Sequence, residues 1–219
     1  MADAAVESAH AHVAHHFDDA EQQREASTLG MWVFLVQEVM FFGGLFTLYV
    51  VYRTLHPDGF AHASHHLDVV LGATNTAVLI TSSLTMALGV WASQMDRRRL
   101  LLVCIALTAL LGAVFLGIKS YEYWHKFQDG LVPGPLFTYT GPEAKQIELF
   151  LSIYFTMTGL HALHMVIGIG IMAWLLRGAL AGRYGPAYHN PVEVGGLYWH
   201  FVDVVWIFLF PLLYLIGRH

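Results

Sequence analysis

An acidic side chain and two imidazoles lie within long apolar stretches, where ionisable groups are rare. Glu38 is the single charged residue between residues 29 and 52, and His161 and His164 fall within residues 149–176. Two histidines three positions apart share one face of a helix. Because carboxylic acids and imidazoles exchange protons, we predict that Glu38, His161 and His164 form a buried, proton-linked polar group.

This group also has a purely structural interpretation. An ionised, unpaired carboxylate inside a membrane is costly, so Glu38 is expected to be neutral and hydrogen-bonded to His161 or His164. It could handle protons, or it could merely tie two helices together. Two histidines are too few for a haem or copper site, so we predict no catalytic residue and no metal ligand in this chain.

A second polar pair lies near the C-terminal end of the sequence. His200 and Asp203 are again three residues apart, so the buried aspartate could be paired with the histidine. Trp199 and Trp206 are seven residues apart and therefore line one side of the same helix. We assign these four residues to helix packing or contact with another subunit rather than to chemistry.

Five long apolar runs must position these residues. Crossing a hydrocarbon core of roughly 30 Å takes about 20 apolar residues in a helix, and the runs that qualify are residues 29–52, 69–95, 100–118, 149–176 and 194–216. They lack the alternating pattern of barrel strands, so helices are expected. We predict an all-α integral membrane protein, with a polar N-terminal tail (residues 1–28) and a single five-helix transmembrane domain (residues 29–219).

Composition excludes several other classes of protein. Hydrophobic residues make up 56% of the sequence and charged residues 12%, about half the charged share of a soluble domain. The net charge of −5 gives no reason to expect nucleic acid as a partner, and the single cysteine, Cys104, allows no disulfide within the chain. The arginines at positions 97–99 form the most concentrated basic turn, which places the N-terminus in the cytoplasm and the C-terminus outside.

Four segments occur in an order that is typical of one known family. They are the Glu38 segment, Tyr121-Glu122-Tyr123, residues 158–168 and residues 198–210. Together they resemble subunit III of the haem-copper terminal oxidases, the cytochrome c oxidase subunit 3 family, from about Ser27 to Gly217. In this resemblance Glu38 corresponds to the buried family glutamate known for its reactivity with carbodiimides.

The resemblance implies a non-catalytic supporting subunit of a proton-pumping oxygen reductase, a cytochrome c oxidase. Such a subunit carries no redox cofactor, because the haems and copper lie in partner subunits I and II. It stabilises subunit I, binds phospholipid and supports proton uptake during aerobic respiration. Arg183 and Glu193 resemble the family residues that help to hold lipid headgroups. The bacterial inner membrane is the implied location.

The sequence departs from the longer members of the family. Mitochondrial-type subunits have seven spans, and the five found here look like the last five of these. An additional small membrane subunit is therefore expected to take the place of the first two. The same likeness admits subunit III of a quinol oxidase or the related subunit of a nitric oxide reductase. An independent proton carrier is a more distant alternative, because no internal repeat of the transporter kind is present.

Overall fold

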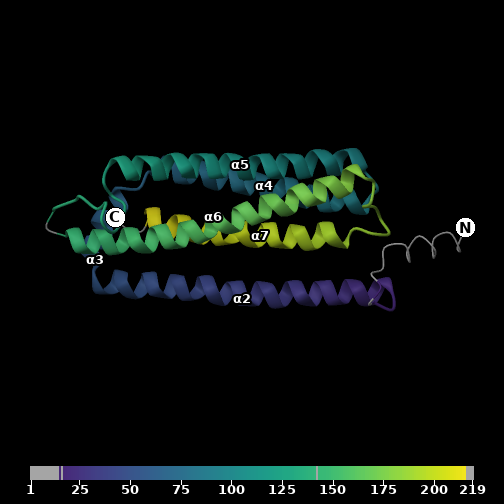
Figure 1. Cartoon of the computed structure of the whole chain (residues 1–219), viewed down its shortest axis with the longest axis horizontal. Helices are drawn as coiled ribbons and strands as arrows, with labels where there is room; N and C mark the ends of the chain where they lie inside the picture. The colour runs from purple at the N-terminus through teal and green to yellow at the C-terminus, as the bar shows by residue number, and fades with distance from the viewer. Residues whose placement is uncertain (1–14, 16, 142, 216–219) are drawn as a thin grey trace, which may run out of the picture.

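The protein is a bundle of long helices running side by side (Figure 1). The computed structural model describes residues 15, 17–141 and 143–215. Its elements in chain order are α2 (Ala20–Leu55), α3 (Pro57–His65), α4 (Val69–Gln94), α5 (Arg98–Gln128), α6 (Ala144–Leu180), α7 (Asn190–Phe210) and the π-helical turn η1 (Pro211–Leu215). Five of these helices are long and apolar enough to cross a membrane, α7 being counted together with η1. The predicted all-α membrane fold with five spans is confirmed.

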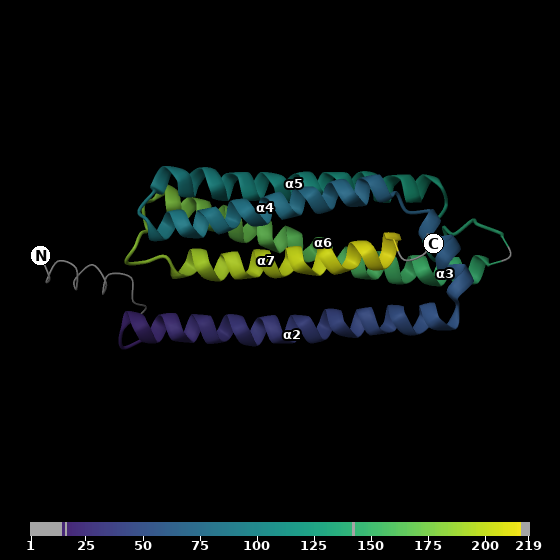
Figure 2. The ribbon, with the colours of Figure 1, turned by 180° about the vertical axis from the view of Figure 1, so that it is seen from behind.

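The five spanning helices differ in how closely they join the bundle. Helices α4 and α5 form an antiparallel hairpin, and α6 crosses the bundle obliquely between this hairpin and α2 (Figures 1 and 2). Helix α7 contacts α2, α4 and α6 and is the most deeply buried of the five spanning helices. Helix α2 lies along one side and contacts only α3, α6 and α7 extensively among the described elements. The short helix α3 caps the end of the bundle opposite to the start of α2 (Figure 2).

Acidic residues define where two of the spanning helices begin. The side chain of Asp19 accepts a hydrogen bond from the backbone N–H of Gln22 at 2.7 Å, at the start of α2. Asp68 accepts hydrogen bonds from Val70 N and Leu71 N at 2.8 and 3.1 Å, at the start of α4. Each carboxylate satisfies N–H groups that have no partner within the helix, and its charge is favourable at that end.

Helices α5 and α6 extend well beyond the spans predicted from the sequence. The third span was expected to end at residue 118, but α5 continues to Gln128, and α6 begins at Ala144 rather than at residue 149. The charged residues beyond residue 118 do not end the helix because two of them pair with each other inside the bundle. Each of these two helices is therefore longer than the span predicted within it.

The N-terminal part of the chain also contains more helix than expected. Helix α2 begins at Ala20, inside the predicted polar tail of residues 1–28. The nine-residue helix α3, with Pro57 in its first turn, was not predicted at all. Its sequence carries two polar histidines and little apolar periodicity, which gave no reason to expect a helix.

The outer surface of the bundle is apolar. Met40, Val70 and Leu84 are 74%, 73% and 60% exposed, respectively, although they are large hydrophobic residues. A soluble protein rarely exposes apolar surface so continuously. Their exposure is the expected arrangement for helices surrounded by hydrocarbon, where association depends on packing and internal hydrogen bonds.

Candidate functional site

Glu38 lies inside the bundle and contacts one of the two predicted histidines. It is 8% exposed, and its Oε2 lies 3.2 Å from His164 Nε2, on α6. The other ring nitrogen, Nδ1 of His164, lies 2.8 Å from the carbonyl oxygen of Leu160. When Nδ1–H donates to that carbonyl, Nε2 is free to accept a proton. This contact brings α2 and α6 together, but by strict geometry Glu38 Oε2 makes no hydrogen bond within the described residues.

His161 does not take part in this contact, contrary to one of the two pairings considered from the sequence. Its ring is 1% exposed and lies between the rings of Phe115 and Trp206, at centroid distances of 5.4 and 5.3 Å. Neither ring nitrogen makes a hydrogen bond within the described residues. The structure therefore separates the two histidines: His164 faces α2, whereas His161 is packed among aromatic rings.

Trp199 and Trp206 are fully buried and join α7 to α4. The indole N–H of Trp199 donates to Ser82 Oγ at 3.1 Å, and that of Trp206 donates to Thr76 Oγ1 at the same distance. The Trp199 ring fits against two glycines. A Cβ at Gly112 would lie 2.6 Å from the ring, and one at Gly168 would lie 3.0 Å from it. These tryptophans are packing residues between helices, one of the two roles expected for them.

His200 and Asp203 lie on the seam between α7 and α4 but do not pair with each other. Nδ1 of His200 lies 2.7 Å from Ser83 Oγ on α4. Asp203 is 2% exposed and interacts with the same Ser83 hydroxyl, but that contact falls outside strict hydrogen-bond geometry. The His–Asp pair that their spacing allows is therefore not formed, and the histidine contacts a hydroxyl on α4 instead.

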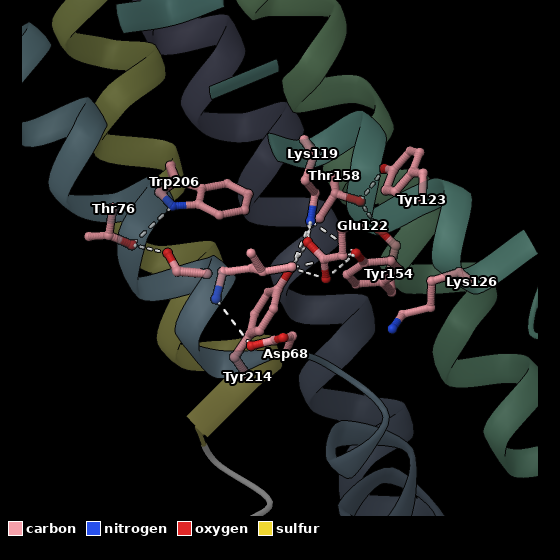
Figure 3. A network of polar contacts seen from close by, with 12 residues as sticks. Asp68, Thr76, Lys119, Glu122, Tyr123, Lys126, Tyr154, Thr158, Trp206 and Tyr214 are labelled. Atoms are coloured by element: carbon pink, nitrogen blue, oxygen red, sulfur yellow. Dashed lines mark hydrogen bonds and ion pairs between the residues drawn. The ribbon is translucent and has the colours of Figure 1, made fainter. Parts of the chain in front are cut away.

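A buried ion pair that the sequence analysis missed lies on α5 (Figure 3). Lys119 and Glu122 are one helical turn apart, and each is 2% exposed. Lys119 Nζ donates to Glu122 Oε2 at 3.0 Å, to the Tyr154 hydroxyl at 2.9 Å and to the Tyr214 hydroxyl at 2.7 Å. These three bonds use every N–H group that the ammonium has.

The carboxylate of this pair is satisfied just as completely. The hydroxyls of Tyr154 and Tyr214 donate to Glu122 Oε1 at 2.9 and 2.7 Å. Each tyrosine therefore accepts from Lys119 and donates to Glu122, which closes the network. The ammonium also lies over the rings of Tyr154 and Trp206, 4.8 and 5.1 Å from their centroids. Below, "the lysine cluster" means Lys119, Glu122, Tyr154 and Tyr214.

The lysine cluster joins three segments that are distant in the sequence. Lys119 and Glu122 come from α5, Tyr154 from α6, and Tyr214 from the π-helical turn η1 that begins at Pro211. A proline has no N–H for the helical ladder, which favours an irregular turn at this point. The hydroxyl of Tyr49 on α2 donates to Leu212 O in the same turn at 2.7 Å. The Glu38–His164 contact, the two tryptophan–hydroxyl bonds and the lysine cluster thus each join different helices of the bundle.

The two residues predicted to hold lipid headgroups lie at the end of the bundle where α2 begins. Arg183 is exposed in the turn after α6. Glu193, in the first turn of α7, accepts a hydrogen bond from Gln94 Nε2 at 2.7 Å and lies 3.4 Å from His189 Nε2. No hydrogen bond or ion pair between Arg183 and Glu193 is found among the described residues.

Comparisons with known proteins give the same family for nearly the whole chain. Residues 5–218 match the family model of cytochrome c oxidase subunit III. The chain is 34% identical over 206 residues to cytochrome c oxidase subunit 3 of Thermostichus vulcanus, covering 92% of both chains. It is 35% identical to cytochrome c oxidase subunit 3 of Corynebacterium diphtheriae, covering 86% of this chain and 87% of the relative.

A relative from another type of oxidase is almost as similar. The probable quinol oxidase subunit 3 of Staphylococcus haemolyticus is 32% identical, covering 91% of this chain and 94% of the relative. Five apolar helices, buried polar ties between them and matches over almost the full length agree with one another. The chain belongs to the cytochrome c oxidase subunit III family of the haem-copper oxidases.

Proposed function

We propose that this protein is the non-catalytic third subunit of a proton-pumping haem-copper cytochrome c oxidase. It would support subunit I, in a complex with subunit II, while the haems, the copper and the oxygen chemistry belong to those partners. The observation that carries this proposal is the family match over residues 5–218. The closed lysine cluster supports it, because its charged groups are all engaged in joining helices.

Purification from native membranes tests this function. Tagged protein extracted in a mild detergent is expected to bring down a haem-bearing subunit, seen as reduced-minus-oxidised haem absorption in the eluate. Removing the gene product should leave oxygen reduction initially active but should shorten its lifetime during turnover. A chain that purifies without haem under conditions that keep other membrane complexes intact would contradict the proposal.

The electron donor is a separate question, and a quinol is the second candidate. The similarity to the quinol oxidase relative is close to that of the cytochrome c oxidase relatives. Assaying the purified complex with reduced cytochrome c and with a reduced quinol in parallel distinguishes the two. Oxygen consumption with cytochrome c alone is the expected result, and consumption with quinol alone would replace the first candidate by the second.

We also propose that the protein binds a phospholipid between α2 and the rest of the bundle. A largely apolar hollow of about 480 Å³ opens there, with Met31, Ile171 and Tyr198 in its walls. A smaller hollow beside it contains Arg24 and Asn190, which suit a phosphate headgroup. This position differs from the predicted Arg183–Glu193 site. Met31→Trp, which fills the hollow, should reduce lipid retained in native mass spectrometry, whereas Val166→Trp on the surface of α6 should not.

The remaining expectations concern the membrane in which the protein lies, its orientation there and a neighbouring subunit. We propose that the protein lies in the bacterial inner membrane with its N-terminus in the cytoplasm, because Arg97, Arg98 and Arg99 lie in or beside the turn between α4 and α5. A small additional membrane subunit is proposed to cover α2, whose exposed side is apolar. Protease accessibility of a tag at the N-terminus in inside-out and right-side-out vesicles tests the orientation. Protection of the tag in inside-out vesicles would reverse it.

A further inference from the structure

The seam between α4 and α7 is hollowed along the outside of the bundle. One hollow of about 400 Å³ is lined mostly by apolar side chains, including Ile80, Leu84 and Ile207. A second, of about 390 Å³, continues from it and shares Ala87 and His200 with the first. Ile80, Leu84 and Ile207 are 54%, 60% and 43% exposed. Below, "the α4/α7 groove" means these two hollows together.

Polar groups lie at the middle of this apolar groove. Ser83, His200 and Asp203 all line the first hollow. Asp203 is the fourteenth residue of the 26-residue span Asn190–Leu215, and Ser83 is the fifteenth of the 26-residue span Val69–Gln94. Both residues are therefore near the centre of the membrane, where water is scarce and a polar group needs a protein partner.

Within the described residues Asp203 interacts with one hydroxyl, that of Ser83, which it shares with a histidine. The Ser83 hydroxyl lies 2.7 Å from His200 Nδ1, and its contact with Asp203 falls outside strict hydrogen-bond geometry. Neither carboxylate oxygen of Asp203 makes a hydrogen bond within the described part of the chain. The contrast with Glu122 is informative, because that carboxylate receives bonds from Lys119, Tyr154 and Tyr214 inside the same bundle. Buried polar groups left unsatisfied in one chain need an explanation.

We propose that the α4/α7 groove seats a transmembrane helix of the haem-bearing oxidase subunit, whose side chain donates an N–H or O–H hydrogen bond to Asp203. This inference rests on the proposed function, and it names the surface and chemistry of the contact. The apolar walls suit an apolar helix, and the aspartate selects one with a donor at mid-depth. A lipid tail offers no donor. A second copy of this chain, packed by the same face, would bring a second carboxylate up to Asp203.

Photocrosslinking in the intact complex tests the location of the partner. Leu84 and Ile207 in the groove are replaced, one at a time, by p-benzoylphenylalanine, which reacts with C–H bonds and therefore works inside a membrane. Val103 on α5 and Val166 on α6, which are 61% and 56% exposed, serve as controls on other faces. The groove positions should crosslink to the haem-bearing subunit, and the controls should not.

The outcomes separate this inference from the function on which it rests. If haem copurifies but the groove positions yield only lipid adducts or crosslinks to a second copy, the groove assignment is overturned and the function stands. If no haem copurifies, the function itself has failed. Crosslinks to the haem-bearing subunit from the control faces, with none from the groove, would also overturn the groove assignment.

Substitution at Asp203 tests the hydrogen bond. Asp203→Leu removes both acceptor oxygens, and Asp203→Asn keeps one. The ratio of this subunit to haem after extended detergent washing should fall about tenfold for Asp203→Leu, as expected for losing one charge-assisted hydrogen bond. It should fall much less for Asp203→Asn. Unchanged retention in Asp203→Leu would overturn the proposed bond. If Asp203→Leu does not fold, Asp203→Ala, which also removes both acceptor oxygens, takes its place, and unchanged retention of that variant would overturn the proposed bond.

Discussion

Removing Glu122 should destabilise the protein more than most single substitutions, because it leaves a buried ammonium without its counter-ion. In Glu122→Leu, Lys119 keeps two tyrosine hydroxyls as acceptors but loses its only anionic partner in the lysine cluster. The hydroxyls of Tyr154 and Tyr214 lose their acceptor at the same time. The substitution is thus expected to break an ion pair and two further hydrogen bonds.

The magnitude follows from the burial of the pair. Both residues are 2% exposed, so solvent does not screen the loss. Breaking a buried ion pair by removing one partner costs about 3–5 kcal/mol, whereas replacing both partners with apolar residues is often close to neutral. The double variant Lys119→Met with Glu122→Leu leaves only two tyrosine hydroxyls to re-pair, at about 1 kcal/mol each. The double variant should therefore be more stable than the single one.

Equilibrium unfolding of the purified chain in mixed micelles tests this expectation. Helicity measured by far-ultraviolet circular dichroism is followed while the denaturing detergent fraction rises, for wild type, Glu122→Leu and the double variant. A loss of about 3–5 kcal/mol in the single variant, with at least half restored in the double variant, is expected. A single variant within about 1 kcal/mol of wild type, or a double variant as unstable as the single one, would refute the reasoning.

Four smaller predictions use other contacts. Glu38→Gln should leave assembly and haem spectra intact and shorten the catalytic lifetime of the oxidase; loss of haem from the purified complex would contradict it. Trp199→Ala should lower the free energy of unfolding by about 3–5 kcal/mol, and an unfolding midpoint equal to that of wild type would argue against its central packing role. Gly112→Ala, whose Cβ would lie 2.6 Å from Trp199, should destabilise the fold, while the matched control Gly117→Ala, with no neighbour within 4 Å, should not; equal effects of the two would be inconsistent with the close approach. Tyr49→Phe should lower the free energy of unfolding by about 1 kcal/mol, because it removes the hydrogen bond from the Tyr49 hydroxyl to Leu212 O. A much larger loss in the same unfolding assay would show that this hydrogen bond is not the main contribution of Tyr49.

The five spans were predictable because hydrocarbon imposes a length and an apolar composition on any helix that crosses it. The ends of the helices were not, because a helix continues past the membrane wherever its polar residues find partners. Lys119 and Glu122 show this clearly: charge alone marked residue 118 as the end of a span, whereas the structure places both residues inside. Only their spacing of three, which allows an ion pair on one helix face, hinted at the pairing.

The choice between His161 and His164 as the partner of Glu38 lay beyond the sequence for a geometric reason. Residues three apart on a helix are separated by roughly 60° around its axis. Both histidines therefore face the bundle, and the rotation of α6 decides which of them meets α2. The ring of Trp206 from α7 and that of Phe115 from α5 occupy the surroundings of His161. That rotation is set by packing among four helices, which no local pattern encodes.

The polar residues of the bundle divide according to whether their partners lie on the same chain. The lysine cluster is closed: every donor of Lys119 is used, and Glu122 receives three donors. Such a network can form as soon as α5, α6 and η1 meet, so it serves folding of the subunit itself. Asp203 is equally buried, but the single hydroxyl that faces it, that of Ser83, is shared with His200. Because membrane burial makes a poorly satisfied carboxylate costly, a donor from the helix proposed to dock in the α4/α7 groove would stabilise the chain most at this site.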